Sequence, residues 1–390
     1  MITVDALQAL LDSRITPLSP RRMPLEGALG QRLAEDVFCE SDEPAFDRSA
    51  MDGFAVSFDA TCGKFTIIGQ SLPGNPIPSR LGRDQALRVF TGSALPPHVR
   101  VVMQENTTSN AGVVDIHSMS EATHVRLRGS AKRAGEQLLP KETPLTPAAI
   151  AILASAGIVT PLIYPRPTVG HLTTGSEIIS PSQTPEAGQI RNTNAPLLRA
   201  LLAEYGAPLL AQKHSGEDPH ESLEQCKEPA MSGTDLLLIS GGASGGAHDH
   251  TANVIKALGF ELVCSKVNCR PGKPLLIGIK EDRVAVGLPG NPLSHFVTFH
   301  IFVRQILALL AGAPAPSWRH AILSGAPILA SDPRETFWPA RTTNDSIQPM
   351  PWLDSGHLSA LLGVNALLRI APNQKPANGK TVAYVPCGLP

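Results

Sequence analysis

"DLLLISGGASGGAHDHTANVIKAL", residues 235–258, is the stretch that decides the fold of this chain. Its apolar run ends at Ser240, four of the next six residues are glycine, and an amphipathic pattern follows. This order is typical of a strand, a tight loop and a helix. Glycine lets backbone N–H groups approach an anion closely, and the following helix adds the positive end of its dipole. We therefore interpret the loop as a phosphate cradle, the alternative being a turn that serves tight packing alone.

The loop differs from two common nucleotide-binding motifs. No lysine follows its last glycine, so the GxxxxGK[ST] spacing of a P-loop is absent. The GxGxxG spacing of dinucleotide-binding folds is absent as well. The sequence therefore argues against a mononucleotide kinase and against a dehydrogenase.

The region around this stretch alternates between predicted strands and amphipathic helices, from residue 167 to 313. This alternation predicts a mainly parallel sheet with helices on both faces, which is a three-layer α/β/α domain. In the helix expected at 194–205 the apolar residues fall on one stripe, and Asn194 is available as its N-cap. A long final helix is expected over the apolar run at 292–310.

The rest of the chain has a different sequence pattern. Short β-rich runs separated by Gly, Pro and Asn clusters precede a helical pattern in which Pro147 suits the first turn and Gly157 the C-terminal stop. Short runs after residue 313 predict a small C-terminal β-barrel module. We expect a multi-domain α/β plus β protein with a helical layer, an inserted β domain, the α/β domain and a C-terminal β domain, at residues 1–36 with 132–166, 37–131, 167–313 and 314–390 respectively.

Composition narrows the class of protein. The chain has 390 residues, of which 42% are hydrophobic, and this length favours several cores. A formal net charge of -1 without a dense Lys/Arg run gives no reason to expect nucleic acid as a partner. We find no signal-peptide pattern and expect no segment that spans a bilayer, so we predict a cytoplasmic protein. The six cysteines include no CxxC pair, which argues against a disulfide framework or a zinc knuckle.

Other predicted strand ends of the α/β domain carry similar small and polar residues. In an open parallel sheet, ligands bind at the carboxyl ends of the strands, where the loops lead into helices. We therefore expect these segments to open onto one rim together with the glycine loop. They are "TTGSE" (173–177), "SGEDP" (215–219), "CRPGKP" (269–274) and "GLPGNP" (287–292).

The predicted rim carries charges of both signs. Its carboxylates are Glu177, Asp218 and Asp249, and its cations are Lys266, Arg270 and Lys273. A hard cation such as magnesium, bridging carboxylates to a phosphate, would explain acids beside a phosphate cradle. The alternative for each acid is a helix N-cap or a surface residue. His248 and His250 raise the question of a transition-metal site, but their spacing is poor on a helix, so we expect solvated loop histidines.

A second dense motif lies far away in the sequence. "SAMDG" (49–53) places Asp52 before a glycine and among small residues, which suits a carboxylate that a ligand or metal approaches closely. "VFTGSALP" (89–96) similarly ends a predicted strand with Thr91 and a glycine. The alternative is that both are structured loops.

Taken in order, these motifs resemble those of the molybdopterin molybdenumtransferase family, the MoeA proteins, which includes the C-terminal part of gephyrin. The resemblance covers essentially the whole chain, including "SGHLSALLGVNALLRIAP" near its end. Each motif alone is modest, and six in register are specific. They are "PAFDRSAMDGFAV" (44–56), "FTGSALP" (90–96), "TTGSEI" (173–178), "SGGASGGAHD" (240–249), "RPGKP" (270–274) and "GLPGNPLS" (287–294).

The resemblance implies an elongated homodimer of four-domain subunits, in which the sheet domain binds molybdopterin. The family's reaction takes adenylylated molybdopterin and molybdate, hydrolyses the adenylate with Mg²⁺, inserts molybdenum at the dithiolene and releases AMP. The N-terminal part of the partner subunit completes the site in such dimers. Contacts with the molybdopterin adenylyltransferase and with recipient molybdoenzymes are implied in the same way.

The resemblance also implies roles for particular residues. The family's acidic and hydroxyl positions fall on Asp52, Thr91, Glu177, Asp218 and Asp249, with Asp218 and Asp249 as metal ligands. Lys266 and Arg270 correspond to the basic residues that face molybdate. The implied ligand-binding residues are Thr174, Gly175, Ser176, Ser240, Gly241, Gly242, Ser244, Gly246, Lys266, Arg270, Lys273, Pro289, Gly290, Asn291 and Pro292.

The chain departs from the family pattern at several positions. Ala247 and Gln137 stand where acids are common, and Arg270 replaces a lysine, which keeps the charge but changes the geometry. A basic residue expected in the last domain is either Arg334 or Arg341, or is missing. One alternative is therefore a non-catalytic carrier of molybdopterin or of the finished cofactor on the same scaffold. Another is an unrelated sugar- or nucleotide-phosphate hydrolase, which would explain the glycine loop but not the other motifs.

Overall fold

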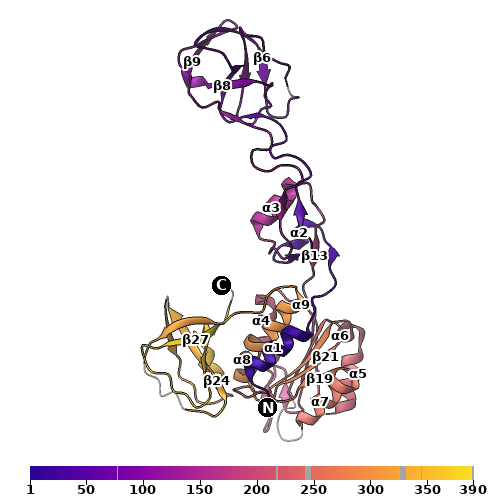
Figure 1. Cartoon of the computed structure of the whole chain (residues 1–390). Helices are drawn as coiled ribbons and strands as arrows, with labels where there is room; N and C mark the ends of the chain where they lie inside the picture. The colour runs from indigo at the N-terminus through magenta and orange to yellow at the C-terminus, as the bar shows by residue number, and fades with distance from the viewer. Residues whose placement is uncertain (77, 217, 242–246, 326–330, 344, 389–390) are drawn as a thin grey trace. The chain divides into compact units, whose positions relative to one another are not determined.

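The computed structural model describes residues 1–390 except 77, 217, 242–246, 326–330, 344 and 389–390, and the side chains of 247–249 are outside the description. The chain divides into two compact units (Figure 1). The first combines Met1–Arg22 with Leu162–Pro390, and the second is Met23–Pro161. Most of the glycine loop therefore lies outside the described residues.

A six-stranded sheet forms the centre of the first unit. Its strands are β14 (Val169–Thr174), β17 (Leu209–Ser215), β18 (Leu236–Ser240), β19 (Glu261–Cys264), β21 (Leu276–Lys280) and β22 (Arg283–Leu288). They lie in the order β17-β14-β18-β22-β21-β19. The first four are parallel, and the last two continue the sheet antiparallel. This confirms the predicted mainly parallel sheet.

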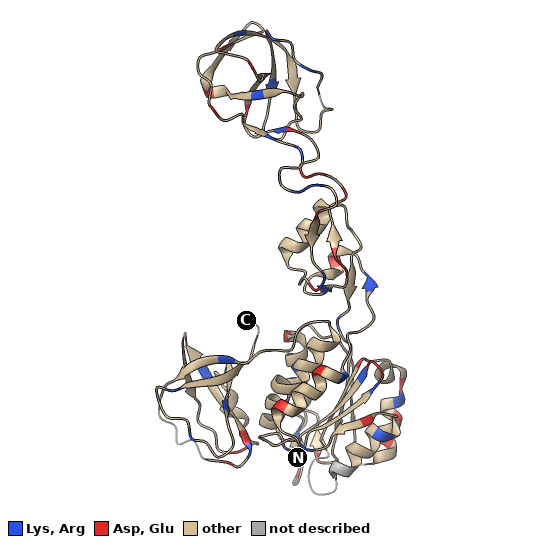
Figure 2. Ribbon diagram, in the orientation of Figure 1, with Lys and Arg blue, Asp and Glu red and all other residues tan. Residues whose placement is uncertain are grey.

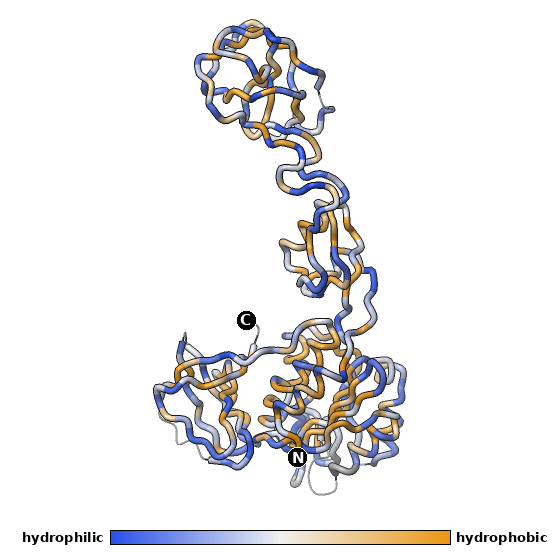
Figure 3. The backbone as a smooth tube through the Cα atoms, in the orientation of Figure 1, coloured by the Kyte–Doolittle hydropathy of each residue, from blue (hydrophilic) through white to orange (hydrophobic). Residues whose placement is uncertain are grey.

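Helices cover both faces of this sheet because its central strands are apolar on both sides. Along β18, Leu236 and Leu238 pack into one core, and Leu237 and Ile239 pack into the other. The first core is completed by α1 (Val4–Arg14), α4 (Asn194–Glu204), α8 (Pro292–Thr298) and α9 (Arg304–Leu310). The second is completed by α5 (Pro219–Lys227), α6 (Pro229–Ser232) and α7 (Ala247–Ala257). Hydrophobic segments accordingly gather along these strands and helices in Figure 3.

The expected long helix runs from Pro292 to Leu310, through α8, the π-helical turn η2 (Phe299–Val303) and α9. By length and composition it could span a membrane, which corrects our expectation that no segment could. However, 83% of the most apolar stretch of this helix is buried within the structure, and Phe302 is fully buried. The helix therefore serves as part of the core.

Helix α1 also belongs to this core. It begins where the Thr3 hydroxyl accepts a hydrogen bond from the Ala6 N–H at 3.3 Å. Leu7 is fully buried with the sheet residues, and Gln305 of α9 donates a hydrogen bond to Asp12 Oδ1 at 2.7 Å. The apolar stripe of α1 thus packs on the sheet domain. The predicted limits of the four domains stay a prediction.

Helix α4 starts differently from the prediction. Thr193, not Asn194, occupies the N-cap position, and the Asn192 side chain accepts a hydrogen bond from the Ala195 N–H at 3.0 Å. The Asn194 side chain instead donates to the carbonyl oxygen of Gly290 at 2.7 Å. The Asn194 side chain, which we expected to cap α4, therefore binds the loop before α8 instead.

The C-terminal module is a closed barrel, as predicted. Its strands are β23 (Arg319–Leu323), β24 (Glu335–Thr343), β25 (Ser346–Pro349), β26 (Ala366–Ile370) and β27 (Thr381–Pro386), and η3 (Leu358–Leu361) lies beside them. β24 pairs with both β25 and β26, which closes the ring. The short strand β20 (Cys269–Arg270), from a loop of the sheet domain, pairs with β24 and joins the two domains.

The second unit contains the predicted β domain. Its six-stranded sheet has the order β8-β5-β7-β6-β10-β9 and consists of β5 (Gly53–Ser57), β6 (Gly63–Ser71), β7 (Gln85–Val89), β8 (Val99–Met103), β9 (Thr107–Asn110) and β10 (Val113–Ile116). Helix α3 (Pro147–Ser155) begins with Pro147 in its first turn, and Gly157 follows it with φ of +75°. This confirms both predicted ends of the helix.

Short elements complete both units. In the first unit they are β1 (Arg21–Arg22), β13 (Leu162–Tyr164), β15 (Ile178–Ile179) and β16 (Ile190–Arg191). In the second they are α2 (Leu25–Ala28), β2 (Arg32–Leu33), β3 (Val37–Phe38), β4 (Arg48–Ser49), η1 (Gln104–Asn106), β11 (Val125–Arg126) and β12 (Gln137–Leu139).

Leu7→Ala tests whether α1 stabilises the sheet domain. Because Leu7 is fully buried, we expect the variant to lose about 2 to 5 kcal/mol of unfolding free energy. Leu210→Ala is the matched control, since Leu210 on β17 is 55% exposed and its truncation should cost less than about 0.5 kcal/mol. Urea denaturation measures both, and equal effects would contradict the packing role of α1.

Candidate functional site

A cavity of about 1180 Å³ lies at the carboxyl ends of the parallel strands β14, β18 and β22. This is the position that the sequence predicted for the ligand. The cavity brings together the predicted residues Thr174, Gly175, Glu177, Ser240, Gly241, Arg270, Lys273, Pro289, Gly290, Asn291 and Pro292. Gly242, Ser244 and Gly246, also predicted, lie outside the described residues.

Gly241 is the first residue of the glycine loop and must be glycine for two reasons. Its φ of +105° is strained for any L side chain, and an added Cβ would lie 2.4 Å from the Thr174 carbonyl oxygen. A Cβ on Gly290 would lie 3.9 Å from the Gly241 Cα, so the loops after β18 and β22 approach each other closely here. Backbone groups of both loops therefore line the cavity at short range.

One wall of the cavity carries two guanidinium groups held by a single carboxylate. Arg334 donates to both oxygens of Asp332, at 2.9 and 3.0 Å, and Arg270 donates to Oδ2 at 2.9 Å. The side-chain hydrogen bonds from Arg334 are the largest cause that lowers the pKa of Asp332 to about 2. Arg270 also lies 5.1 Å from the ring centre of Trp352. The three charges sum to a positive wall, which suits an anionic ligand.

The two arginines named as candidates in the last domain differ in position. Arg334 lines the cavity, whereas Arg341 lies exposed further along β24 and is not among the lining residues. Sequence reasoning missed several other lining residues that come from β16, from the start of α4, from α7 and from the barrel. They include Arg191, Asn192, Asn194, Asn253, Trp352, Asp354 and Ser355. No local motif marks them, because only the folded chain gathers them.

The three predicted carboxylates differ in position. Glu177 is exposed and lines the cavity. Asp218 accepts a hydrogen bond from the His220 N–H at 2.9 Å as the N-cap of α5, and it is not among the lining residues, although the next residue, Pro219, is. Asp249 lies in the first turn of α7, and its side chain is outside the description.

The histidines near the glycine loop lie on a helix, because α7 begins at Ala247. This corrects the expectation of loop histidines. His250 lines the cavity, and its Nε2 lies 3.1 Å from the Ser222 hydroxyl, so it is neither in a loop nor fully solvated. Within the part of the chain that the structure describes, no group of three or more His, Cys, Asp or Glu side chains could hold a metal ion.

Besides Asp218, four predicted site residues that the structure describes do not line this cavity. Lys266 and Ser176 are exposed beside the sheet but are not among the lining residues. Asp52 and Thr91 belong to the second unit, where they contact each other: Asp52 Oδ1 accepts from the Thr91 N–H at 2.8 Å and from its hydroxyl at 2.9 Å. These two hydrogen bonds from Thr91 hold the pKa of Asp52 below its ordinary value, and the backbone N–H has the larger effect. This carboxylate is therefore kept ionised and oriented.

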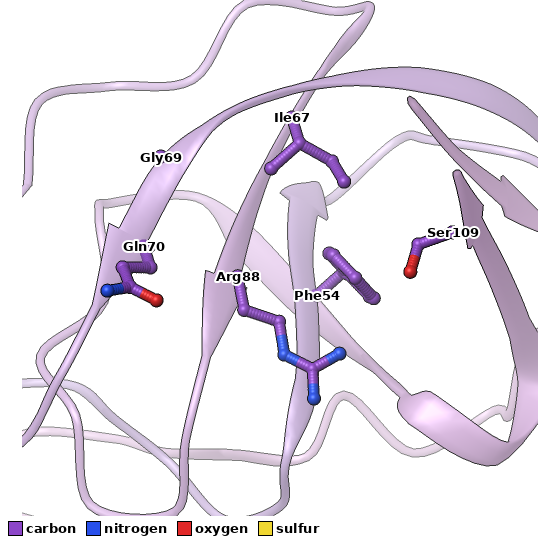
Figure 4. A pocket seen from close by; sticks show the side chains of 6 residues that line it. All are labelled: Phe54, Ile67, Gly69, Gln70, Arg88 and Ser109. Carbon is purple, nitrogen blue, oxygen red and sulfur yellow. The ribbon is translucent and has the colours of Figure 1, made fainter. Parts of the chain in front are cut away.

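A second cavity of about 460 Å³ opens on the β sheet of the second unit (Figure 4). Arg88 is the charged side chain in its lining, and its guanidinium lies 4.8 Å from the ring centre of Phe54 and donates to Gln104 Oε1 at 2.8 Å. The larger cavity instead combines several cations, two carboxylates and strand-end loops. Charges of both signs are otherwise interspersed over the two units (Figure 2). The larger cavity is therefore the candidate site.

The fold and the cavity define a multi-domain α/β protein with a positively charged cavity at the strand ends of its sheet domain. Residues 2–157 match the MoeA N-terminal region (domain I and II), and residues 170–309 match the probable molybdopterin binding domain. The molybdopterin molybdenumtransferase of Staphylococcus aureus is 30% identical over 318 residues, which cover 79% of this chain and 75% of that protein. The chain therefore belongs to the molybdopterin molybdenumtransferase (MoeA) family, whose members are transferases of molybdenum cofactor biosynthesis.

Other relatives agree with this assignment. The molybdopterin molybdenumtransferase of Staphylococcus epidermidis is 30% identical over 300 residues, 75% of this chain and 71% of that protein. Two crystal structures of the molybdopterin biosynthesis MoeA protein from Pyrococcus horikoshii match with TM-scores of 0.83 and 0.78, at 26% and 28% identity. They cover 99% of this chain, and 99% and 100% of those chains. The resemblance inferred from the motifs is confirmed.

Asp332→Asn tests the arginine cluster through acid stability. Because the folded pKa of Asp332 lies near 2, below its ordinary value of 3.8, the carboxylate stabilises the fold above pH 3.8. This contribution is lost as pH falls from 3.8 through about 2. We expect the unfolding free energy of Asp332→Asn not to fall over this pH range for this reason. Asp345→Asn, at an exposed position of the same barrel, should show the same fall as the wild type. Identical acid profiles for all three proteins would contradict the cluster.

Proposed function

We propose that this protein inserts molybdenum from molybdate into adenylylated molybdopterin and releases AMP. Membership of the molybdopterin molybdenumtransferase family supports the reaction. The observation that carries the proposal is the cavity at the strand ends, whose wall holds two guanidinium groups and whose floor is made of backbone from two glycine-containing loops. Such a site suits a ligand that carries phosphates beside a second oxyanion.

The cations have separate tasks in this proposal. Arg270 and Arg334 share the carboxylate of Asp332, so their guanidiniums are oriented before a ligand arrives. Oriented donors lose little freedom on binding and favour a planar or tetrahedral oxyanion such as molybdate. Lys273 and Arg191 line other parts of the cavity and would neutralise the phosphates. Lys266 is the weakest candidate of the predicted cations, since it is not among the lining residues.

Magnesium fits the residues that are present. Glu177 and Asp218 are hard oxygen donors near the cavity, and Asp249 follows the glycine loop. Mg²⁺ is commonly held by one or two carboxylates together with substrate phosphates and water, so a cage of several protein ligands is not required. When bound, the ion would screen the phosphate charge. Asp218 and Asp249 would hold it, and Glu177 would orient water or phosphate beside them.

The proposal includes a homodimer. Asp52 and Thr91 lie in the second unit, and their hydrogen bonds keep a carboxylate ionised and directed. We infer that these residues complete the cavity of a partner subunit, as in the family. The reaction would take place in the cytoplasm, between an enzyme that adenylylates molybdopterin and the molybdoenzymes that receive the product.

A second candidate function is a non-catalytic carrier of molybdopterin. Gln137 is exposed on β12 and Ala247 opens α7, and both stand where the family pattern carries acids. The loss of two carboxylates favours binding without turnover, because each could have held the metal or water. The arginine cluster and the ionised Asp52 favour the transferase.

Asp249→Ala tests the transferase against the carrier. We expect the purified protein to release AMP from adenylylated molybdopterin only when Mg²⁺ and molybdate are both present. Removing one carboxylate at a charge-stabilising site should slow release by about a hundredfold or more. Asp282→Ala, in the exposed turn between β21 and β22, is the control and should retain the wild-type rate. Binding of the nucleotide form without AMP release would identify a carrier.

Arg334→Ala and Arg341→Ala form a matched pair for the anion site. Arg334 lines the cavity and Arg341 is exposed elsewhere on β24. We expect Arg334→Ala to raise the KM for molybdate by about tenfold to a hundredfold, the loss of one charge-assisted hydrogen bond. Arg341→Ala should leave it unchanged. AMP release at increasing molybdate concentrations measures both, and equal KM values for the two variants would contradict an anion role for Arg334.

A further inference from the structure

The hydroxyl of Ser240 lies between two buried imidazoles beneath the cavity. Its Oγ is 2.6 Å from His171 Nε2 and 3.2 Å from His295 Nε2. All three residues are fully buried, at 0% exposure. They come from three elements, β14, β18 and α8, so these contacts join distant parts of the sheet domain.

The outer partners determine which nitrogen of each ring carries hydrogen. His295 Nδ1 lies 3.0 Å from the Pro289 carbonyl oxygen, which only accepts, so Nδ1 donates and Nε2 accepts from the Ser240 hydroxyl. The Gln212 amide nitrogen lies 2.9 Å from His171 Nδ1, so Nδ1 accepts and Nε2 donates to Ser240. Every bond of the chain therefore runs in one direction, from Gln212 to Pro289.

Both imidazoles are neutral in this arrangement. Burial lowers the pKa of His171 to about 3, with a further contribution from His295, and lowers the pKa of His295 to about 4. A proton added to either ring would leave two donors facing one another along the chain. The hydrogen-bond directions and the burial thus agree on one neutral state.

The chain ends at both loops that form the floor of the cavity. Ser240 is the last residue of β18 and directly precedes Gly241. Pro289 begins the loop that continues with Gly290 and Asn291, and this loop is held at two further points: Gly290 accepts from Asn194, and Asn291 donates to the Ser355 hydroxyl at 2.6 Å. Removing one of these hydrogen bonds would break the side-chain connection between the loop and the strand end.

We propose that His171 and His295 are positioning residues for molybdopterin, which hold the Ser240 strand end and the 289–291 loop at the spacing that the ligand needs. This inference rests on the proposed function. The Ser240 hydroxyl is fully buried and its hydrogen is donated to His295, so Ser240 acts through the backbone that it anchors. Neither histidine lines the cavity, and their effect on binding is therefore indirect.

The tautomers are the first test, because they require neither a ligand nor a variant. Nitrogen NMR of histidine-labelled protein should show His171 with hydrogen on Nε2 and His295 with hydrogen on Nδ1, both neutral across the range in which ordinary histidines titrate, about pH 5 to 8. The two opposite tautomers are the signature of a one-way chain. Identical tautomers, or a ring that titrates in this range, would overturn the proposal.

His295→Leu tests the consequence for binding, with His300→Leu as the matched control. His300 lies on the same helix, is 2% exposed and also has a pKa lowered to about 3 by burial. It takes no part in the row of hydrogen bonds from Gln212 to Pro289. A fluorescence titration measures the affinity for molybdopterin. We expect the affinity of His295→Leu to be about tenfold weaker and that of His300→Leu to change less than about twofold. His295→Asn, whose amide N–H can reach the Pro289 carbonyl, should recover part of the affinity.

The outcomes separate the two proposals. Wild-type affinity in His295→Leu would overturn the positioning role and leave the proposed function standing. Wild-type protein that binds no molybdopterin would overturn the proposed function, and the positioning role with it. If His295→Leu does not fold, Ser240→Ala removes a single oxygen from the same chain and should show the same tenfold loss, about the effect of one hydrogen bond.

Discussion

The parallel pairing of β14, β18 and β22 is the constraint on which the site depends. In this register Ser240 lies beside Thr173 on one side and beside Leu288 on the other, so the three strands end together. Parallel strands present their carboxyl ends at one edge, and every loop that leaves them must start there. The interiors of these strands are apolar and buried on both faces, so the ends, where polar residues such as Ser240 and Thr174 follow, meet the loops.

The barrel contributes part of the cavity wall, and the short strand β20 of the sheet domain joins the two domains. Pairing of β20 with β24 places Arg270 beside Thr336, and the turn before β24 then brings Asp332 and Arg334 to the cavity wall. The shared carboxylate offsets part of the desolvation penalty of the two guanidiniums, since both donate hydrogen bonds to it. The cluster remains positive overall and so remains open to an anion.

Sequence reasoning succeeded where a pattern is local and failed where a partner is remote. The strand that ends at Ser240, the helix that follows the glycine loop, the helix that begins at Pro147 and the motifs that define the family are each contiguous in the chain. The capping role given to Asn194 was wrong because its side chain meets Gly290, far away in the sequence, which competes with the local cap. The expectation that no segment could span a bilayer was wrong for the helix from Pro292, because its length and composition fit a membrane as well as a core.

The sequence by itself determined the alternation of strands and helices, the glycine loop and the residues that carry the family resemblance, because these depend on spacing along the chain. Only the tertiary structure decided that Arg334 and not Arg341 lines the cavity, and that His171 and His295 meet at Ser240. Hydrogen bonds between side chains of different elements leave no periodic trace in a sequence. They depend on the strand register and on the packing of α8, which the whole core sets together.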